Sequence, residues 1–185
     1  MKQTIGVLFF ALSASASAQS FEQPRQQVDL YGGGSYQVGV TGSAVMGVQV
    51  RQNFGRFAGV GGYYNFSPVR SEIGANAAGI ETSGSLQVHD YGAAIELHAA
   101  RRLQPYILGT LGGISSQIRA SARNYAADLK AIVTETHFAY GAGVGMRFHF
   151  NRRAAIFAES RLVRAAVSDA DYFVRGVVGV TLTLP

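Results

Sequence analysis

The 185-residue chain contains no cysteine, no tryptophan and only four prolines. Without cysteine it has no disulfides to support a small exported domain. Its 23 glycines follow no Gly-X-Y period and come without proline enrichment, which excludes a collagen-like fibre and a flexible linker. Beyond the N-terminus no apolar run is long enough to cross a bilayer as a helix. The chain is therefore either soluble after export or crosses a membrane as a closed β-barrel.

The N-terminal sequence MKQTIGVLFFALSASASA has the order of a secretory signal peptide. A charged start at Lys2 precedes a short apolar run, and small residues end at Ala18. We expect residues 1–18 to be removed, leaving a single domain over residues 19–185. A disordered N-terminus is the alternative interpretation.

The net charge of +5 falls to +4 when Lys2 is removed with the signal peptide. The arginines are dispersed, with adjacent pairs only at 101–102 and 152–153. Export makes nucleic acid an unsuitable partner, whereas anionic lipid and lipopolysaccharide headgroups are available outside the cytoplasm. Arginines in turns can bind lipid phosphate as bidentate forks, although a solvated turn charge is the commoner situation.

Apolar and polar residues alternate with a period of two throughout the mature chain, which is typical of β-strands. The pattern predicts eight strands, over residues 28–37, 43–52, 56–66, 85–98, 105–118, 134–150, 154–164 and 172–184.

The connections between these strands alternate in length. Residues 53–55, 99–103 and 151–153 are short enough for tight turns, whereas 67–84 and 119–133 are long and rich in small residues. Short turns at one end and longer loops at the other are typical of an up-and-down barrel in the outer membrane, with the long loops outside the cell. Residues 122–131 have an alternative interpretation as one or two helical turns.

The stretch AYGAGVGMRFHF, residues 139–150, shows which face meets lipid. One face carries large apolar side chains, including Val144 and Met146, and the other carries glycines and isolated charges. A soluble barrel would cover its exterior densely with polar residues, whereas an outer-membrane barrel is apolar outside and polar inside. We expect Val144 and Met146 to face lipid, around an interior that has room only for side chains.

Three segments carry a likeness to a known family: PYILGTLGG at 105–113, YGAGVGMRFHFNRRAAIFAESRLVR at 140–164 and GVVGVTLTL at 176–184. With them the chain resembles the OmpA-like and OmpX-like small outer-membrane β-barrels. The resemblance implies an all-β, eight-stranded antiparallel up-and-down transmembrane barrel in the bacterial outer membrane. It also implies a monomer that is inserted by the outer-membrane assembly machinery and surrounded by outer-membrane lipid and lipopolysaccharide.

The charges on the polar faces predict a network inside the lumen. Arg147 is expected opposite or diagonal to Glu159, and Arg175 approaches Glu159 from the other side. Glu159 is the expected central acceptor, with Glu96 reaching in from across the barrel and Arg161 on the same face as Glu159. As an alternative, Arg161 and Arg175 extend to bulk water near a mouth of the barrel.

The sequence contains no recognisable catalytic, metal or cofactor motif. The histidines at 89, 98, 137 and 149 lack metal-ligand spacing, and the glycine runs at 32–35 and 141–145 lack the residues of a phosphate loop. Ser115 or Ser116 with His137 is the candidate pair for a lipid hydrolase, although no residue that would orient the histidine is evident from the sequence.

We therefore predict a non-enzymatic envelope protein with a structural or surface-interaction role and a lumen filled by side chains. The alternatives are a small porin-like channel, an outer-membrane lipid-modifying enzyme and a soluble periplasmic barrel.

Overall fold

The computed structural model describes residues 26–37, 42–73, 81–123, 128–166 and 172–184. The expected signal peptide at residues 1–18 lies outside the described residues. No helix in the described part of the chain is long and apolar enough to span a membrane.

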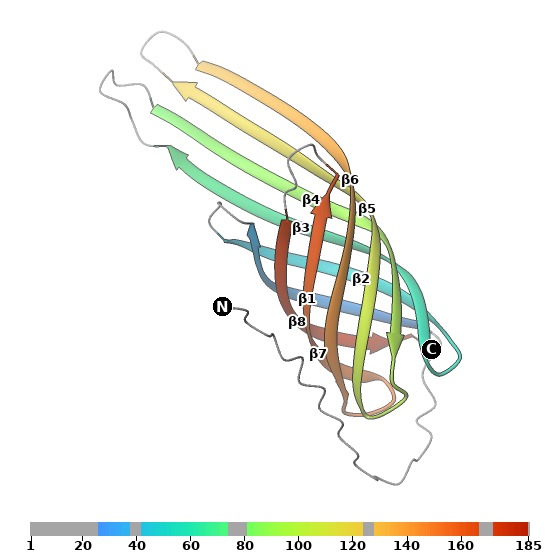
Figure 1. Ribbon diagram of the computed structural model, residues 1–185. Helices are drawn as coiled ribbons and strands as arrows, with labels where there is room; N and C mark the ends of the chain where they lie inside the picture. The colour runs from blue at the N-terminus through green and yellow to red at the C-terminus, as the bar shows by residue number, and fades with distance from the viewer. Residues whose placement is uncertain (1–25, 38–41, 74–80, 124–127, 167–171, 185) are drawn as a thin grey trace, which may run out of the picture.

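Eight antiparallel strands close into one barrel, in which each strand pairs with its neighbours in sequence and β1 pairs with β8 (Figure 1). The all-β, up-and-down prediction is confirmed. The strands are β1 (Gln26–Gln37), β2 (Ser43–Phe54), β3 (Ala58–Ile73), β4 (Glu81–His98), β5 (Leu103–Arg123), β6 (Asp128–His149), β7 (Ala154–Ala165) and β8 (Tyr172–Thr183).

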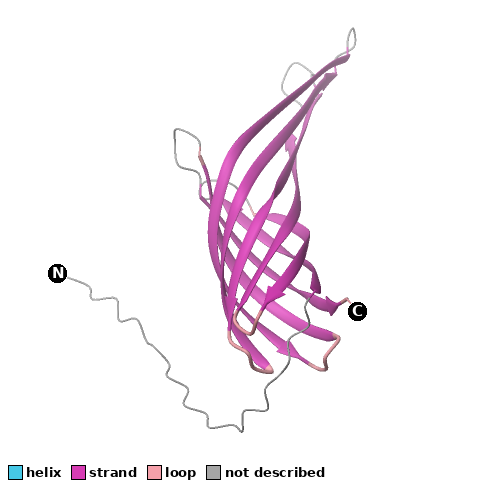
Figure 2. Ribbon diagram, turned by 90° about the vertical axis from the view of Figure 1, so that its right-hand side faces the viewer, coloured by secondary structure: helices cyan, strands magenta, loops and turns pink. Residues whose placement is uncertain are grey.

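Three tight turns gather at one end of the barrel, called here the turn end (Figure 2). In the β2–β3 turn, Gly55 has a φ of 67°, a left-handed conformation that glycine adopts without steric cost. In the β6–β7 turn, the side-chain oxygen of Asn151 accepts hydrogen bonds from the backbone N–H groups of Arg153, at 2.7 Å, and Ala154, at 2.9 Å. These residues close hairpins at the places where the sequence predicts short connections.

The four central strands are longer than expected, and the prediction of loops over 67–84 and 119–133 is wrong. The β3–β4 ladder continues to Ile73 opposite Thr82, and the β5–β6 ladder continues to Arg123 opposite Asp128. The helical alternative at 122–131 is also wrong where that segment is described. Residues 74–80 and 124–127 lie outside the described residues. Small side chains gave these segments a loop-like composition, but the backbone pairs regardless of side-chain size.

Strands β3–β6 consequently extend beyond β1, β2, β7 and β8 at the end opposite the turns (Figures 1 and 2). The lengths differ clearly, since β5 has 21 residues and β6 has 22, whereas β7 and β8 have 12 each. The last β6–β7 pair is Ala139 with Ala165, so β6 residues before Ala139 continue without β7 beside them. We call this projecting part of β3–β6 the four-stranded extension.

The outer face of the barrel wall is apolar and its inner face is polar, as the sequence predicts. Val144 is 60% exposed on the outer face, and Met146 is 46% exposed, whereas Arg147 between Met146 and Phe148 is 1% exposed. Both apolar residues therefore point outward, as predicted. An apolar exterior around a polar interior is the arrangement that a barrel needs in lipid.

Candidate functional site

The barrel interior holds the most concentrated chemistry in the described part of the chain. Its buried charges comprise four guanidinium groups and four carboxylates, which balance in sign. They belong to Arg51, Arg147, Arg161, Arg175, Asp29, Asp90, Glu96 and Glu159.

The first cluster is centred on Glu96, near the turn end. Arg147 on β6 donates to both Glu96 oxygens, from Nη1 to Oε1 at 2.9 Å and from Nη2 to Oε2 at 3.2 Å. Arg51 on β2 also donates to Glu96 Oε2. Charge-assisted, two-point contacts of this kind are among the strongest hydrogen bonds in proteins. Glu96 thus joins three strands, none of which is the sequence neighbour of another.

The surrounding polar groups complete this cluster. Asp29 Oδ2 lies 3.4 Å from guanidinium nitrogens of both Arg51 and Arg147. Thr181 on β8 accepts a hydrogen bond from Arg147 Nε at 3.1 Å, and Gln104 on β5 accepts one from Nη1 at 3.3 Å. A buried charge is tolerated only when it is paired and hydrogen-bonded in this way.

The second cluster pairs Glu159 with Arg161 on β7. Arg161 donates to Glu159 Oε1 from Nε at 2.9 Å and from Nη2 at 2.7 Å. The Tyr106 hydroxyl donates to Glu159 Oε2 at 3.2 Å, and the Arg147 guanidinium lies 4.7 Å from the centre of the Tyr106 ring. Tyr106 therefore connects the first cluster to the second.

The third cluster is centred on Asp90, which pairs with Arg175. Asp90 also accepts hydrogen bonds from the Tyr63 hydroxyl at 3.0 Å and from Asn65 Nδ2 at 3.1 Å. The Tyr31 hydroxyl in turn donates to Asn65 Oδ1 at 2.7 Å. These contacts span β1, β3, β4 and β8.

An apolar cluster lies beyond these polar groups, toward the four-stranded extension. It is formed by buried Ile114, Ala139, Val163 and Ala165, against which Val88 and Phe173 pack. The side chains of the three polar clusters and of the apolar cluster together occupy the barrel interior.

The five charges predicted from the sequence all project into the interior, but their partners differ from the prediction. Glu159 is not the central acceptor, because Arg147 turns to Glu96 and Arg175 turns to Asp90. Arg147 is indeed diagonal to Glu159, since the register pairs Arg147 with Phe157 and Glu159 with Gly145. The Arg147 side chain nevertheless turns away from Glu159 and reaches over β5 to Glu96 on β4. The alternative that Arg161 and Arg175 extend to water is wrong, since they are 4% and 3% exposed.

Sequence reasoning missed Arg51, Asp29 and Asp90 as members of the network. Arg51 and Asp90 lie on faces that the alternation marks as polar, so their inward direction was predictable. Their partners were not predictable, because those partners come from strands on other sides of the closed barrel.

The hydrolase candidate has different outcomes for its two serines. Ser116 pairs with Glu135 and shares a face with His137. The His137 Nε2 lies 3.5 Å from a carboxylate oxygen of Glu135, but no hydrogen bond in the described part of the chain joins Ser116 to His137. Ser115 is on the other face of the β5–β6 ladder, because it is paired with Thr136. The Ser115 hydroxyl instead accepts a hydrogen bond from Thr136 at 3.2 Å. The described residues contain no group of three His, Asp or Glu side chains arranged to hold a metal ion.

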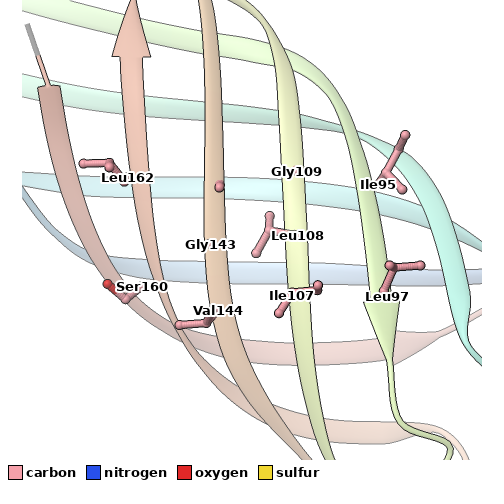
Figure 3. Close-up of a pocket in the computed structure, with 10 residues that line it drawn as sticks. Ile95, Leu97, Ile107, Leu108, Gly109, Gly143, Val144, Ser160 and Leu162 are labelled. Atoms are coloured by element: carbon pink, nitrogen blue, oxygen red, sulfur yellow. The ribbon is translucent and has the colours of Figure 1, made fainter. Parts of the chain in front are cut away.

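A shallow apolar depression marks the outer wall over β4–β7 (Figure 3). It arises where small residues such as Gly109 and Ala142 lie between Ile95, Ile107 and Leu162. A side chain added at Gly109 would meet no heavy atom within 4 Å, so the hollow is the space that this glycine leaves. Its lining contains no charged residue and consists of apolar side chains, glycines and Ser160.

Comparison with known proteins finds matches among solved structures. No protein-family model matches the chain, and no curated protein matches it. Among solved structures, the chain is similar to Ail, the attachment invasion locus protein of Yersinia pestis, in complex with the heparin analogue sucrose octasulfate. The TM-score is 0.58 at 15% identity, over 85% of this chain and 95% of that chain. The chain has the fold of the small eight-stranded outer-membrane β-barrels.

A second solved structure supports the same fold. Neisserial surface protein A matches with a TM-score of 0.53 at 15% identity, over 86% of this chain and 96% of that chain. At 15% identity these two matches establish the fold alone. The interior contacts described above are observed in this chain.

Proposed function

We propose that the protein is a monomeric, non-enzymatic integral protein of the bacterial outer membrane, with a structural or surface-interaction role and a closed lumen. In this proposal residues 1–18 direct export, and the assembly machinery inserts residues 19–185 among outer-membrane lipids and lipopolysaccharide. The observation that carries the closed lumen is the contact of Glu96 with both Arg51 and Arg147 across the barrel.

The interior contacts favour a closed barrel over a porin-like channel. Conduction needs a continuous aqueous path, but Arg51, Glu96 and Arg147 link opposite strands through the interior. Gln27 and Gln104 beside them are fully buried. An apolar cluster around Ile114 lies further along the same interior. An ion would have to separate buried pairs and then cross an apolar layer, and both steps cost free energy.

The four-stranded extension supports the surface-interaction part of the proposal. It carries β5 and β6 well beyond the ends of the short strands, and its β6 residues include exposed Ile132 and Val133. Ail, which shares the fold, is an attachment and invasion protein that was crystallised with a heparin analogue. A projecting sheet provides a contact surface without a catalytic centre.

Planar-bilayer recording tests the closed lumen directly. We expect purified protein, shown to be folded by heat-modifiable gel mobility, to produce no stable conductance steps. A Glu96→Ala/Arg147→Ala variant removes the central pair together and should produce leak currents if it folds. Stable wild-type conductance would overturn the closed lumen, whereas failure to insert into any bilayer would overturn the membrane placement.

A further inference from the structure

The turn end carries an unusual concentration of positive charge. Its three turns, at 55–57, 99–102 and 150–153, contain no aspartate or glutamate. They carry five exposed arginines, which are Arg56, Arg101, Arg102, Arg152 and Arg153. We call these residues the arginine ring.

The carboxylates nearest in the fold do not neutralise the arginine ring. Asp29 and Glu96, the buried acids close to this end, are engaged by Arg51 and Arg147 inside the barrel. Among the described residues no ion pair joins any member of the ring to a carboxylate. Within the part of the chain that the structure describes, the positive charge of the ring is therefore uncompensated.

Arg102 shows how a ring member is held. Its Nε donates to the backbone carbonyl of His149 at 3.1 Å, and its guanidinium lies 5.3 Å from the centre of the Phe148 ring. Phe148 belongs to the outward-facing positions of β6, so the guanidinium is placed at the edge of the lipid-facing wall. Stacking and one hydrogen bond orient the planar group while leaving its two terminal nitrogens for a ligand.

Exposed apolar side chains lie beside the arginines. Phe57 is 65% exposed, Phe54 59%, Leu103 53% and Phe150 52%, and all four are within or next to the same turns. Aromatic residues at this position in a barrel form the belt at the boundary between hydrocarbon and headgroups. The arginine ring consequently lies at headgroup level.

We propose that the arginine ring binds the phosphate groups of anionic phospholipids in the leaflet around the turn end, with Arg102 as an oriented phosphate fork. This inference rests on the proposed membrane placement. Guanidinium groups match phosphate oxygens in a two-point geometry, and each basic residue close to an anionic membrane surface adds about 1 kcal/mol, roughly a fivefold gain in binding. The adjoining phenylalanines favour a lipid over a polyanion in the aqueous space, which would have no apolar contact to make.

Native mass spectrometry of the full chain in detergent micelles tests the proposal, with phosphatidylglycerol and phosphatidylcholine as probes. We expect the wild type to retain phosphatidylglycerol preferentially, and Arg102→Gln/Arg153→Gln to bind it about 25-fold more weakly. Arg102→Lys should lose part of the preference, because it keeps the charge but not the fork. Arg119→Gln is the matched control, since Arg119 is an exposed arginine on β5 far from the turns.

Two results would overturn this assignment. One is equal retention of the two lipids by the wild type, and the other is unchanged phosphatidylglycerol binding in the double variant. A third result would also contradict the proposal. If the arginines are required for binding to isolated peptidoglycan and phosphatidylglycerol is not preferred, the ligand is an aqueous polymer and not a lipid. Every variant is also tested for heat-modifiable gel mobility, which shows that the barrel has folded. A wild type that forms no membrane barrel would contradict the proposed function itself, whereas the results above concern only the arginine ring.

Discussion

Arg147 and Glu96 meet in the barrel interior at 2.9 Å, although β5 separates their strands in the sheet and 51 positions separate them in the chain. The contact passes over β5, and with the Arg51–Glu96 contact it links β2 and β6 on opposite sides of the barrel. Glu96 is the closer of the two carboxylates that both buried arginines contact, the other being Asp29 at 3.4 Å.

Replacing Glu96 with alanine should destabilise the barrel by about 3–5 kcal/mol, because the buried Arg51 and Arg147 would lose their closest carboxylate and keep only the longer contacts to Asp29. Urea unfolding in detergent micelles, followed by gel mobility, measures the loss. Glu135→Ala is the control, since that side chain is 63% exposed, and it should change stability by no more than about 0.5 kcal/mol. Similar losses in both variants would contradict the central position of Glu96.

Gly145→Ala should destabilise the barrel by about 1–3 kcal/mol through overpacking. A methyl group at Gly145 would collide with the Tyr106 ring, which also contacts Arg147 and Glu159. Gly176→Ala is the matched control, because a methyl group there meets no heavy atom within 4 Å. The same unfolding assay should show a loss for Gly145→Ala alone, and a neutral Gly145→Ala would mean that Tyr106 lies elsewhere.

Arginine substitutions along β6 should report depth in the bilayer. Val144 and Ile132 are comparably exposed, at 60% and 65%, but Val144 lies in the closed barrel and Ile132 in the four-stranded extension. Val144→Arg should cost about 2–4 kcal/mol, as at a bilayer midplane, and Ile132→Arg about 0–1 kcal/mol. Folding yield and unfolding free energy in lipid vesicles provide the comparison. Equal costs would place the extension inside the hydrocarbon region.

The absence of native cysteine permits a direct test of sidedness. Ile132→Cys should react with a membrane-impermeant maleimide in intact cells, because the four-stranded extension is expected outside. Arg152→Cys, in a tight turn, should react only after the outer membrane is permeabilised. Labelling of the turn residue alone in intact cells would show that the barrel is inserted with the opposite orientation.

The sequence by itself determined the number and order of strands, the three tight turns and the two faces of the wall. These features are local: side chains alternate across a strand, and a turn needs only a few suitable residues. Val144 and Arg147 therefore point outward and inward as the alternation predicts.

Only the tertiary structure decided how far the strands run and which interior charges meet. The segments at 67–73 and 119–123 are strands because a paired backbone ladder continues through them, although the first lacks the regular apolar–polar alternation that indicates a strand and the second has only alanine at its apolar positions. Arg147 pairs with Glu96 and not with Glu159, because closing the barrel brings non-adjacent strands within reach of one long side chain. That distance across the lumen is a property of the closed sheet and is not contained in the spacing of residues along any one strand.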